Sequence, residues 1–187
     1  GNPLYFLDVF EGDNSTNKLT MALNGLWEVV PGLTFEPSAS LYRIRGRSWE
    51  FQPTYQFAAG QLIDSRDAFE SRNLRAQAQA EGVFTYNDVF ADVHNVELKA
   101  GGSFYHRHFN QFSASGRGAS SDYIPTLNAS AEETNVFSEE TDRRIVGGFG
   151  RVQYDYNRTY LLTASFRYDG ASNLGANNKW GFFPGIS

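Results

Sequence analysis

The sequence contains no cysteine and no long apolar run, and these two absences exclude several classes of protein. Without cysteine among its 187 residues, the chain can form no disulfide, no thiolate metal site and no thiol nucleophile. No run of apolar residues approaches the ~18 that a membrane-spanning helix needs. The net charge of −5 argues against nucleic acid as a partner, because contacts with phosphates need a basic face.

Alternation with a period of two is the main pattern that the sequence does contain. It places uncharged residues on one face and polar residues on the other, as in a β-strand. No Asp, Glu, Lys or Arg falls on the apolar faces, although 20% of the residues are charged. The pattern predicts six strands, at residues 19–29, 33–42, 74–86, 95–106, 146–156 and 160–168.

The connections between these predicted strands alternate between short and long. Short turns follow the first, third and fifth strands, whereas long loops follow the others, at about residues 46–73, 107–144 and 169–182. Such alternation is typical of neighbouring strands that run up and down, with all the long loops at one end. The sequence therefore predicts an all-β fold, an antiparallel up-and-down meander of about six strands.

Two features favour lipid as the environment of the apolar faces. The faces extend over about nine to eleven residues, the length of a tilted membrane strand. Aromatic residues such as Trp27, Tyr86 and Tyr154 lie near the short-turn ends, as in an interfacial girdle. Because single-chain membrane barrels start at about eight strands, six strands would form part of a larger transmembrane β-barrel. A soluble β-sandwich or barrel that binds ligands or mediates adhesion is the alternative, since it also hides one uncharged face.

The last quarter of the chain carries a set of family motifs. Tyr154 and Tyr156 end one strand, and Tyr160 to Leu162 begin the next. Four further motifs follow them: Arg167 with Asp169-Gly170-Ala171-Ser172, Asn178 to Gly181, Phe183-Pro184, and Ser187. This stretch closely resembles the barrel of SusC/RagA-like TonB-dependent outer-membrane transporters. Residues 84–106 are similar to an earlier hairpin of the same barrel, and residues 18–35 fit it more loosely.

The resemblance implies a transporter in the outer membrane of a Gram-negative, Bacteroidetes-like bacterium. Such a protein would import glycans or peptides together with a SusD-like surface lipoprotein, and its plug region would bind TonB. Residues 1–187 are expected to be a partial barrel segment with three hairpins whose long loops are extracellular. The plug domain and the TonB box are expected to be absent from the chain, and the expected partners are those two proteins, the solute and outer-membrane lipid.

The candidate site residues belong to the loops and to the polar faces. Aromatic rings stack on sugars or apolar side chains, so the loop candidates for ligand binding are Trp49, Phe51, Tyr55, Tyr123 and Phe137. An alternative is that the loops fold over themselves with the same residues. The polar faces would line the lumen through Arg75, Gln77, Gln79, Glu81, Glu97, Lys99, Arg151 and Arg167.

No covalent chemistry is indicated, so the chain is not expected to be an enzyme and no catalytic residue or cofactor is assigned. His106 and His108 share one face of an extended segment, a spacing that can hold a metal ion. A polar strand end at the membrane surface explains them more simply. No metal site is therefore expected.

Overall fold

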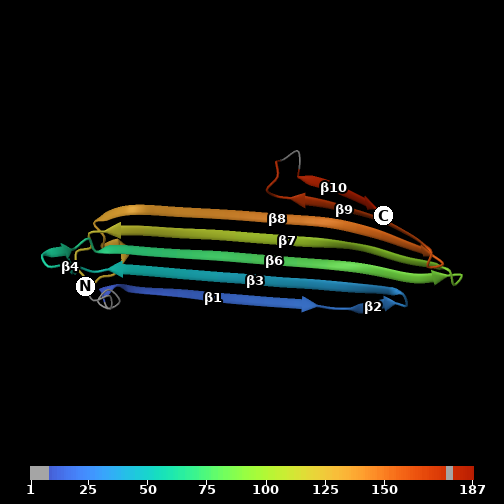
Figure 1. Ribbon diagram of the computed structural model, residues 1–187, viewed down its shortest axis with the longest axis horizontal. Coiled ribbons are helices and arrows are strands. Elements are labelled where there is room, and N and C mark those ends of the chain that lie inside the picture. Colours follow the sequence, from blue (N-terminus) through green and yellow to red (C-terminus); the bar gives the residue numbers. More distant parts are fainter. Residues whose placement is uncertain (1–8, 176–178) are drawn as a thin grey trace. The chain divides into compact units, whose positions relative to one another are not determined.

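The computed structural model describes residues 9–175 and 179–187, so Asn178 of the family motif and part of the third expected loop lie outside the described residues. The long β-strands of the described residues follow one another side by side in chain order (Figure 1). The strands are β1 (Glu11–Asn24), β2 (Trp27–Val30), β3 (Leu33–Gln52), β4 (Tyr55–Ala58), β5 (Gln61–Ile63), β6 (Asp67–Phe90), β7 (His94–Arg117), β8 (Glu132–Tyr156), β9 (Tyr160–Ala171) and β10 (Trp180–Ile186). A short 3₁₀ helix, η1 (Leu127–Ala129), precedes β8.

The main sheet has the order β1-β3-β6-β7-β8-β9-β10, and β2 pairs with β3. The pairs β8–β9, β9–β10 and β2–β3 are antiparallel. Strands β4 and β5 form a separate two-stranded sheet within the first long connection. The predicted antiparallel meander is therefore confirmed. No helix among the described residues has both the length and the apolar character needed to cross a bilayer.

The residues divide into two compact units. The first, here called the loop unit, comprises residues 9–19, 43–75 and 108–141 of the described chain. The second, the turn unit, comprises residues 20–42, 76–107 and 142–187, with the gap noted above. The loop unit holds the two longest connections, and the turn unit holds the short ones.

The short turns of the turn unit have the backbone geometry that tight hairpins require. Asn157 and Arg158 join β8 to β9 with φ values of 48° and 53°, and Ala91 and Asp92 join β6 to β7 with φ values of 50° and 59°. Two consecutive residues with positive φ define the turn whose twist matches that of paired strands. Gly32, with φ of 83°, ends the turn that precedes β3.

The strands are longer than the alternation predicted, and the connections are correspondingly shorter. Strand β3 continues to Gln52 and β6 begins at Asp67, so the first long connection covers residues 53–66 rather than 46–73. The second covers residues 118–131 rather than 107–144, and β9 continues to Ala171. Polar residues occupy both faces of these extensions, and hydrophobic alternation is therefore absent even though the backbone pairing continues. Strands β4, β5 and β10 were missed for a related reason, since each is too short for a clear alternation.

The register between β8 and β9 confirms the two predicted faces in the turn unit. Residues directly opposite each other in an antiparallel pair point to the same side of the sheet. Apolar partners face each other at Tyr154↔Leu162 and Gly150↔Phe166, and polar ones at Arg151↔Ser165 and Gln153↔Thr163. We call the side that carries Leu162 the apolar face and the side that carries Arg151 the polar face.

Large apolar side chains of the turn unit remain exposed. Leu23 is 73% exposed, Leu98 40% and Leu162 52%. A β-sandwich would bury these side chains between two sheets. The described residues instead place them on an uncovered surface, which is what a lipid-facing wall requires.

Candidate functional site

The connections of the loop unit are held by a small hydrophobic core centred on Phe51. Phe51, on β3, and Ala119, in the second connection, are each 1% exposed. Ala68, on β6, belongs to the same cluster. Trp49, Leu127 and Ala129 pack against it. The core therefore joins the end of β3 to the connection that contains η1, and Phe51 has a packing role.

A carboxylate ties the two connections of the loop unit together. Oδ1 of Asp122 accepts a hydrogen bond from the backbone N–H of Thr54 at 2.9 Å and another from Nε of Arg66 at 2.8 Å. The Thr54 N–H is the first cause that holds the pKa of Asp122 below its ordinary value, and the Arg66 guanidinium adds to it. In addition, the N–H of Gly118 donates to the carbonyl of Ser65 at 2.6 Å. These bonds fix the first connection against the second.

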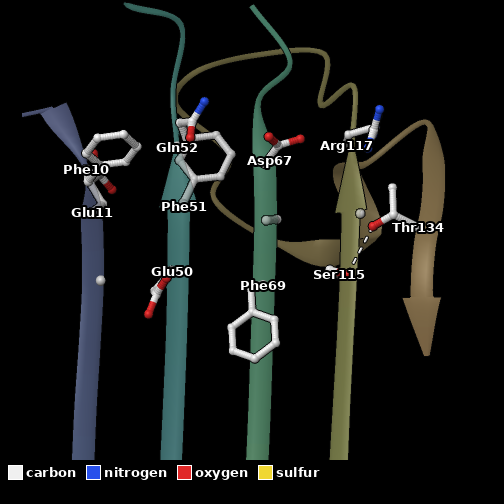
Figure 2. Close-up of a pocket in the computed structure, with 13 residues that line it drawn as sticks. Phe10, Glu11, Glu50, Phe51, Gln52, Asp67, Phe69, Ser115, Arg117 and Thr134 are labelled. Atoms are coloured by element: carbon white, nitrogen blue, oxygen red, sulfur yellow. Dashed lines mark hydrogen bonds between the residues drawn. The ribbon is translucent and has the colours of Figure 1, made fainter. Parts of the chain in front are cut away.

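A cavity of about 490 Å³ lies at the strand ends of the loop unit, close to Phe51 (Figure 2). Its lining combines aromatic rings, carboxylates and one guanidinium. The residues whose side chains define this character are Phe10, Glu11, Glu50, Phe51, Asp67, Phe69 and Arg117. On the other side of the cavity, Oγ1 of Thr134 donates to Oγ of Ser115 at 3.0 Å. Rings that stack and carboxylates that accept hydrogen bonds are the groups that bind hydroxyl-rich or peptide-like solutes.

Several of the aromatic residues that were predicted to lie in loops lie on strands instead. Trp49 and Phe51 belong to β3, and Phe137 belongs to β8, so these three were wrongly placed in loops. Tyr55 lies on β4, where its ring meets Phe10 edge to face at 5.6 Å. Tyr123 lies in the second connection and is 93% exposed. Phe51 is thus packed among other residues of the loop unit, whereas the Tyr123 side chain is exposed.

Sequence reasoning missed most of the cavity. Glu11, Glu50, Asp67 and Arg117 were not singled out because no apolar alternation marks their segments. The predicted loop boundary also separated Glu50 from strand β3. Pairing of long polar strand ends, which a single sequence does not reveal, brings these side chains to one cavity.

The polar face of the turn unit carries a network centred on Arg167. Nε of Arg167 donates to Oδ2 of Asp169 at 2.6 Å, and one terminal nitrogen donates to Oγ of Ser103 at 3.0 Å. Its guanidinium lies 5.6 Å from the centre of the Phe149 ring. A Cβ atom on Gly101 would lie 2.6 Å from that ring, so glycine leaves the space that the ring fills. Arg167 is therefore fixed on β9 by groups from β7 and β8.

The other predicted lumen residues also make contacts along their strands. Arg75 lies over the Phe109 ring at 5.7 Å in the loop unit. In the turn unit, Nζ of Lys99 is 3.6 Å from Oε2 of Glu97, and Arg151 donates to Oε1 of Gln153 at 2.7 Å. Gln77, Gln79 and Glu81 follow Arg75 at intervals of two along β6 and so share its side of the strand. Gln79 and Glu81 border a depression of about 510 Å³ together with Ser103, Tyr105 and Arg167.

One histidine of the predicted pair, His106, contacts a carboxylate on β8. Nε2 of His106 is 2.7 Å from Oδ2 of Asp142, and an arginine, Arg144, lies 3.1 Å from the other oxygen of that carboxylate. Among the described residues, no group of three or more His, Asp or Glu is arranged to hold a metal ion.

The sequence of the chain is similar to those of known TonB-dependent receptors. The chain is 30% identical over 99% of its length to TonB-dependent receptor P39 of Formosa agariphila. It is 31% identical over 51% of its length to TonB-dependent receptor SusC of Bacteroides thetaiotaomicron. These alignments cover 18% and 9% of the two receptors, so the chain spans less than a fifth of their length. No family model matches the sequence.

Solved structures show the same fold. A structure of the RagAB peptide transporter superposes on 98% of this chain with a TM-score of 0.85, at 16% sequence identity, and the match covers 20% of that transporter chain. The RagAB peptide importer in its open-open state gives a TM-score of 0.84 over the same share of the chain.

The meander and its two faces define a segment of a β-barrel wall, with the fold that the RagAB transporter chain also has. Together with the sequence matches, they show that the chain belongs to the SusC/RagA-like TonB-dependent receptors. The relatives carry the names of receptors and transporters rather than of enzymes.

Proposed function

We propose that this chain forms part of the wall and outer loops of a TonB-dependent outer-membrane transporter that imports glycans or peptides. The polar face would line the lumen and contact the plug or the solute. The apolar face would contact outer-membrane lipid, and the connections of the loop unit would be extracellular. A surface lipoprotein would pair with the loops, and TonB would act through a plug region elsewhere in the protein.

One observation carries the proposal: the turn unit has a hydrogen-bonded polar face and an uncovered apolar face on the same strands. Arg167, Asp169 and Ser103 are linked on the polar side, while Leu23 and Leu162 are more than half exposed. Placing an arginine at the lipid-facing midplane of a barrel costs ~2–4 kcal/mol. The segregation of charge to one side is therefore the arrangement that a membrane wall needs.

The cavity of the loop unit supports a role in solute capture. Glu50 and Asp67 offer hydrogen-bond acceptors, Arg117 offers donors, and Phe69 offers an apolar surface. This mixture suits sugar hydroxyls and also peptide groups. The proposal therefore names both solute classes, and the experiment below distinguishes them.

Uptake by the full-length transporter in an outer membrane tests the proposal. Cells would be given labelled oligosaccharides or labelled peptides, with and without functional TonB. The expected result is TonB-dependent uptake of one solute class, reduced in Glu50→Gln/Asp67→Asn and retained in Arg158→Gln, whose side chain lies in a turn of the other unit. Uptake that does not need TonB, or a protein that is monodisperse in plain buffer without detergent, would overturn the transporter role in favour of the soluble binding module.

A further inference from the structure

Two arginines of the loop unit share a single carboxylate, and a third arginine lies two residues before one of them on β3. Nε of Arg47, on β3, lies 3.3 Å from Oε1 of Glu70 on β6, and a terminal nitrogen of Arg72 lies 2.7 Å from the same oxygen. Arg45 precedes Arg47 by two residues on β3 and therefore shares its side of the strand. Among the described residues, Arg45 has no ion-pair partner of its own. We call Arg45, Arg47 and Arg72 the arginine cluster.

The contacts determine on which side of β6 the cluster lies. Glu70, Arg72 and Leu74 alternate on one side, whereas Arg75 lies on the other and contacts the Phe109 ring. Arg75 belongs to the residues proposed to line the lumen. The arginine cluster therefore lies on the opposite side, which is the side proposed to face the membrane.

The cluster borders a depression of about 560 Å³. Amide and hydroxyl side chains complete its polar lining, and Leu74 gives it one apolar border; the residues other than the three arginines are Ser15, Asn17, Gly46, Asn73, Leu74 and Asn110. No carboxylate is among them. Arg47 and Arg72 are 54% and 63% exposed at their side chains, so their guanidinium groups can reach a ligand.

The charge of the cluster remains positive at neutral pH. Nε and a terminal nitrogen of Arg72 both donate to Oε1 of Glu70, at 3.0 Å and 2.7 Å, so the carboxylate is paired with this guanidinium. One negative charge then balances only one of the three guanidinium groups. The remaining positive charge has amide donors and an apolar residue next to it.

We propose that the arginine cluster binds the phosphate-bearing headgroup of an anionic outer-leaflet lipid. Guanidinium groups match phosphate with two parallel hydrogen bonds, and clusters of basic residues at a membrane boundary attract anionic headgroups. On β6 the apolar residue Leu74 stands two residues from Arg72 and shares its side of the strand, so an apolar surface borders the cluster. The inference rests on the proposed membrane orientation but not on the identity of the solute.

Lipid retention by the full-length transporter tests the proposal. The purified protein would be placed in nanodiscs that contain phosphatidylcholine and a small fraction of diphosphoryl lipid A, and bound lipid would be counted by native mass spectrometry after mild delipidation. The test variant is Arg45→Gln/Arg47→Gln/Arg72→Gln. The matched control is Arg107→Gln/Arg143→Gln/Arg158→Gln, which removes the same charge from positions outside the cluster.

The expected result is a roughly tenfold loss of retained lipid A in the test variant, since each basic residue near an anionic surface adds to binding. The control should retain lipid A as the unmodified protein does. Lipid A from which both phosphates have been removed should be retained no better than phosphatidylcholine. Equal loss in both triple variants, or no loss in the test variant, would overturn the proposal.

Two further variants test the proposal if Arg45→Gln/Arg47→Gln/Arg72→Gln does not fold. Arg45→Lys/Arg47→Lys/Arg72→Lys keeps the charge but not the planar fork, and it should retain an intermediate amount of lipid A. Glu70→Gln frees two arginines and should increase retention, whereas unchanged or weaker retention would contradict the proposal. A protein that folds without detergent or lipid would instead refute the membrane role itself, so the two failures are distinguishable.

Discussion

Arg167 and Asp169 stand two residues apart on β9 and are joined on the polar face by a 2.6 Å hydrogen bond from Nε to Oδ2. Oδ1 of the same carboxylate is buried and, among the described residues, has no hydrogen-bond partner. Arg167 therefore supplies this carboxylate with both a hydrogen bond and an opposite charge. This pair links the charges of the polar face to the packing of the neighbouring strands.

Replacement of Arg167 tests that dependence. Arg167→Ala removes the hydrogen bonds to Asp169 and Ser103 and the contact with the Phe149 ring. The free energy of unfolding should fall by ~1 kcal/mol, the scale of a partly exposed charged pair. Urea unfolding of the full-length protein in detergent would measure it. Arg158→Ala is the control and should leave the unfolding midpoint unchanged; an equal loss in the control would contradict the assignment.

Two adjacent glycines of β8 predict opposite responses to the same substitution. A Cβ atom on Gly147 would collide with Oδ1 of Asp169, whereas one on Gly148 would meet nothing nearer than the Gly101 carbonyl at 3.8 Å. Gly147→Ala should therefore lower the free energy of unfolding by ~1–3 kcal/mol, as overpacking does, and Gly148→Ala should have little effect.

A second substitution identifies the cause of the Gly147 effect. Asp169→Ala in the Gly147→Ala background removes the colliding atom and should recover part of the lost stability. Thermal unfolding of the three proteins would show it. A double variant that is no more stable than Gly147→Ala would mean that the collision is not the cause.

The core of the loop unit depends on one aromatic side chain. Phe51→Ala should cost ~3–5 kcal/mol locally, because a buried ring is replaced by a cavity. Hydrogen exchange of residues 118–131, measured by mass spectrometry, should accelerate. Tyr123→Ala removes an exposed ring from the same connection and should leave exchange unchanged while weakening solute uptake. If both substitutions accelerate exchange alike, the packing role of Phe51 is wrong.

The link between the two connections should depend on pH. The pKa of Asp122 is lowered in the folded protein, first by the Thr54 N–H, so folding favours its ionised form. The resulting stabilisation is fully present above the ordinary Asp value of about 3.9 and is lost as pH falls through the lowered folded pKa. Exchange of the Thr54 amide would follow it from neutral pH to about pH 3. Asp122→Asn should abolish this dependence; a variant with the same pH profile would contradict it.

Hydrophobic alternation predicted the elements of the turn unit because every second residue there meets an apolar environment. The predicted segment 160–168 and its turn at Asn157 and Arg158 correspond to β9 and its positive-φ turn. Alternation failed in the loop unit, where both faces of a strand meet polar surroundings. Strand β8 begins at Glu132, within a run of charged residues that no apolar pattern distinguishes from a loop.

The sequence predicted those candidate site residues that lie on alternating strands, but not the contacts between distant strands. Arg167 could be placed on the polar face from its position relative to Leu162 and Phe166. Its partner Ser103 is 64 residues away, and only the pairing of strands brings the two together. The cavity near Phe51 and the arginine cluster likewise depend on register between distant segments.

The glycine next to Phe149 has a consequence for the space above the polar face. With no side chain at Gly101, the Phe149 ring packs close to the backbone of β7, and the Arg167 guanidinium lies over the same ring. A cationic group is thereby held close to the sheet without a bulky side chain rising beside it. In the proposed transporter, a hydrated solute would therefore pass a fixed arginine without meeting a bulky side chain beside it.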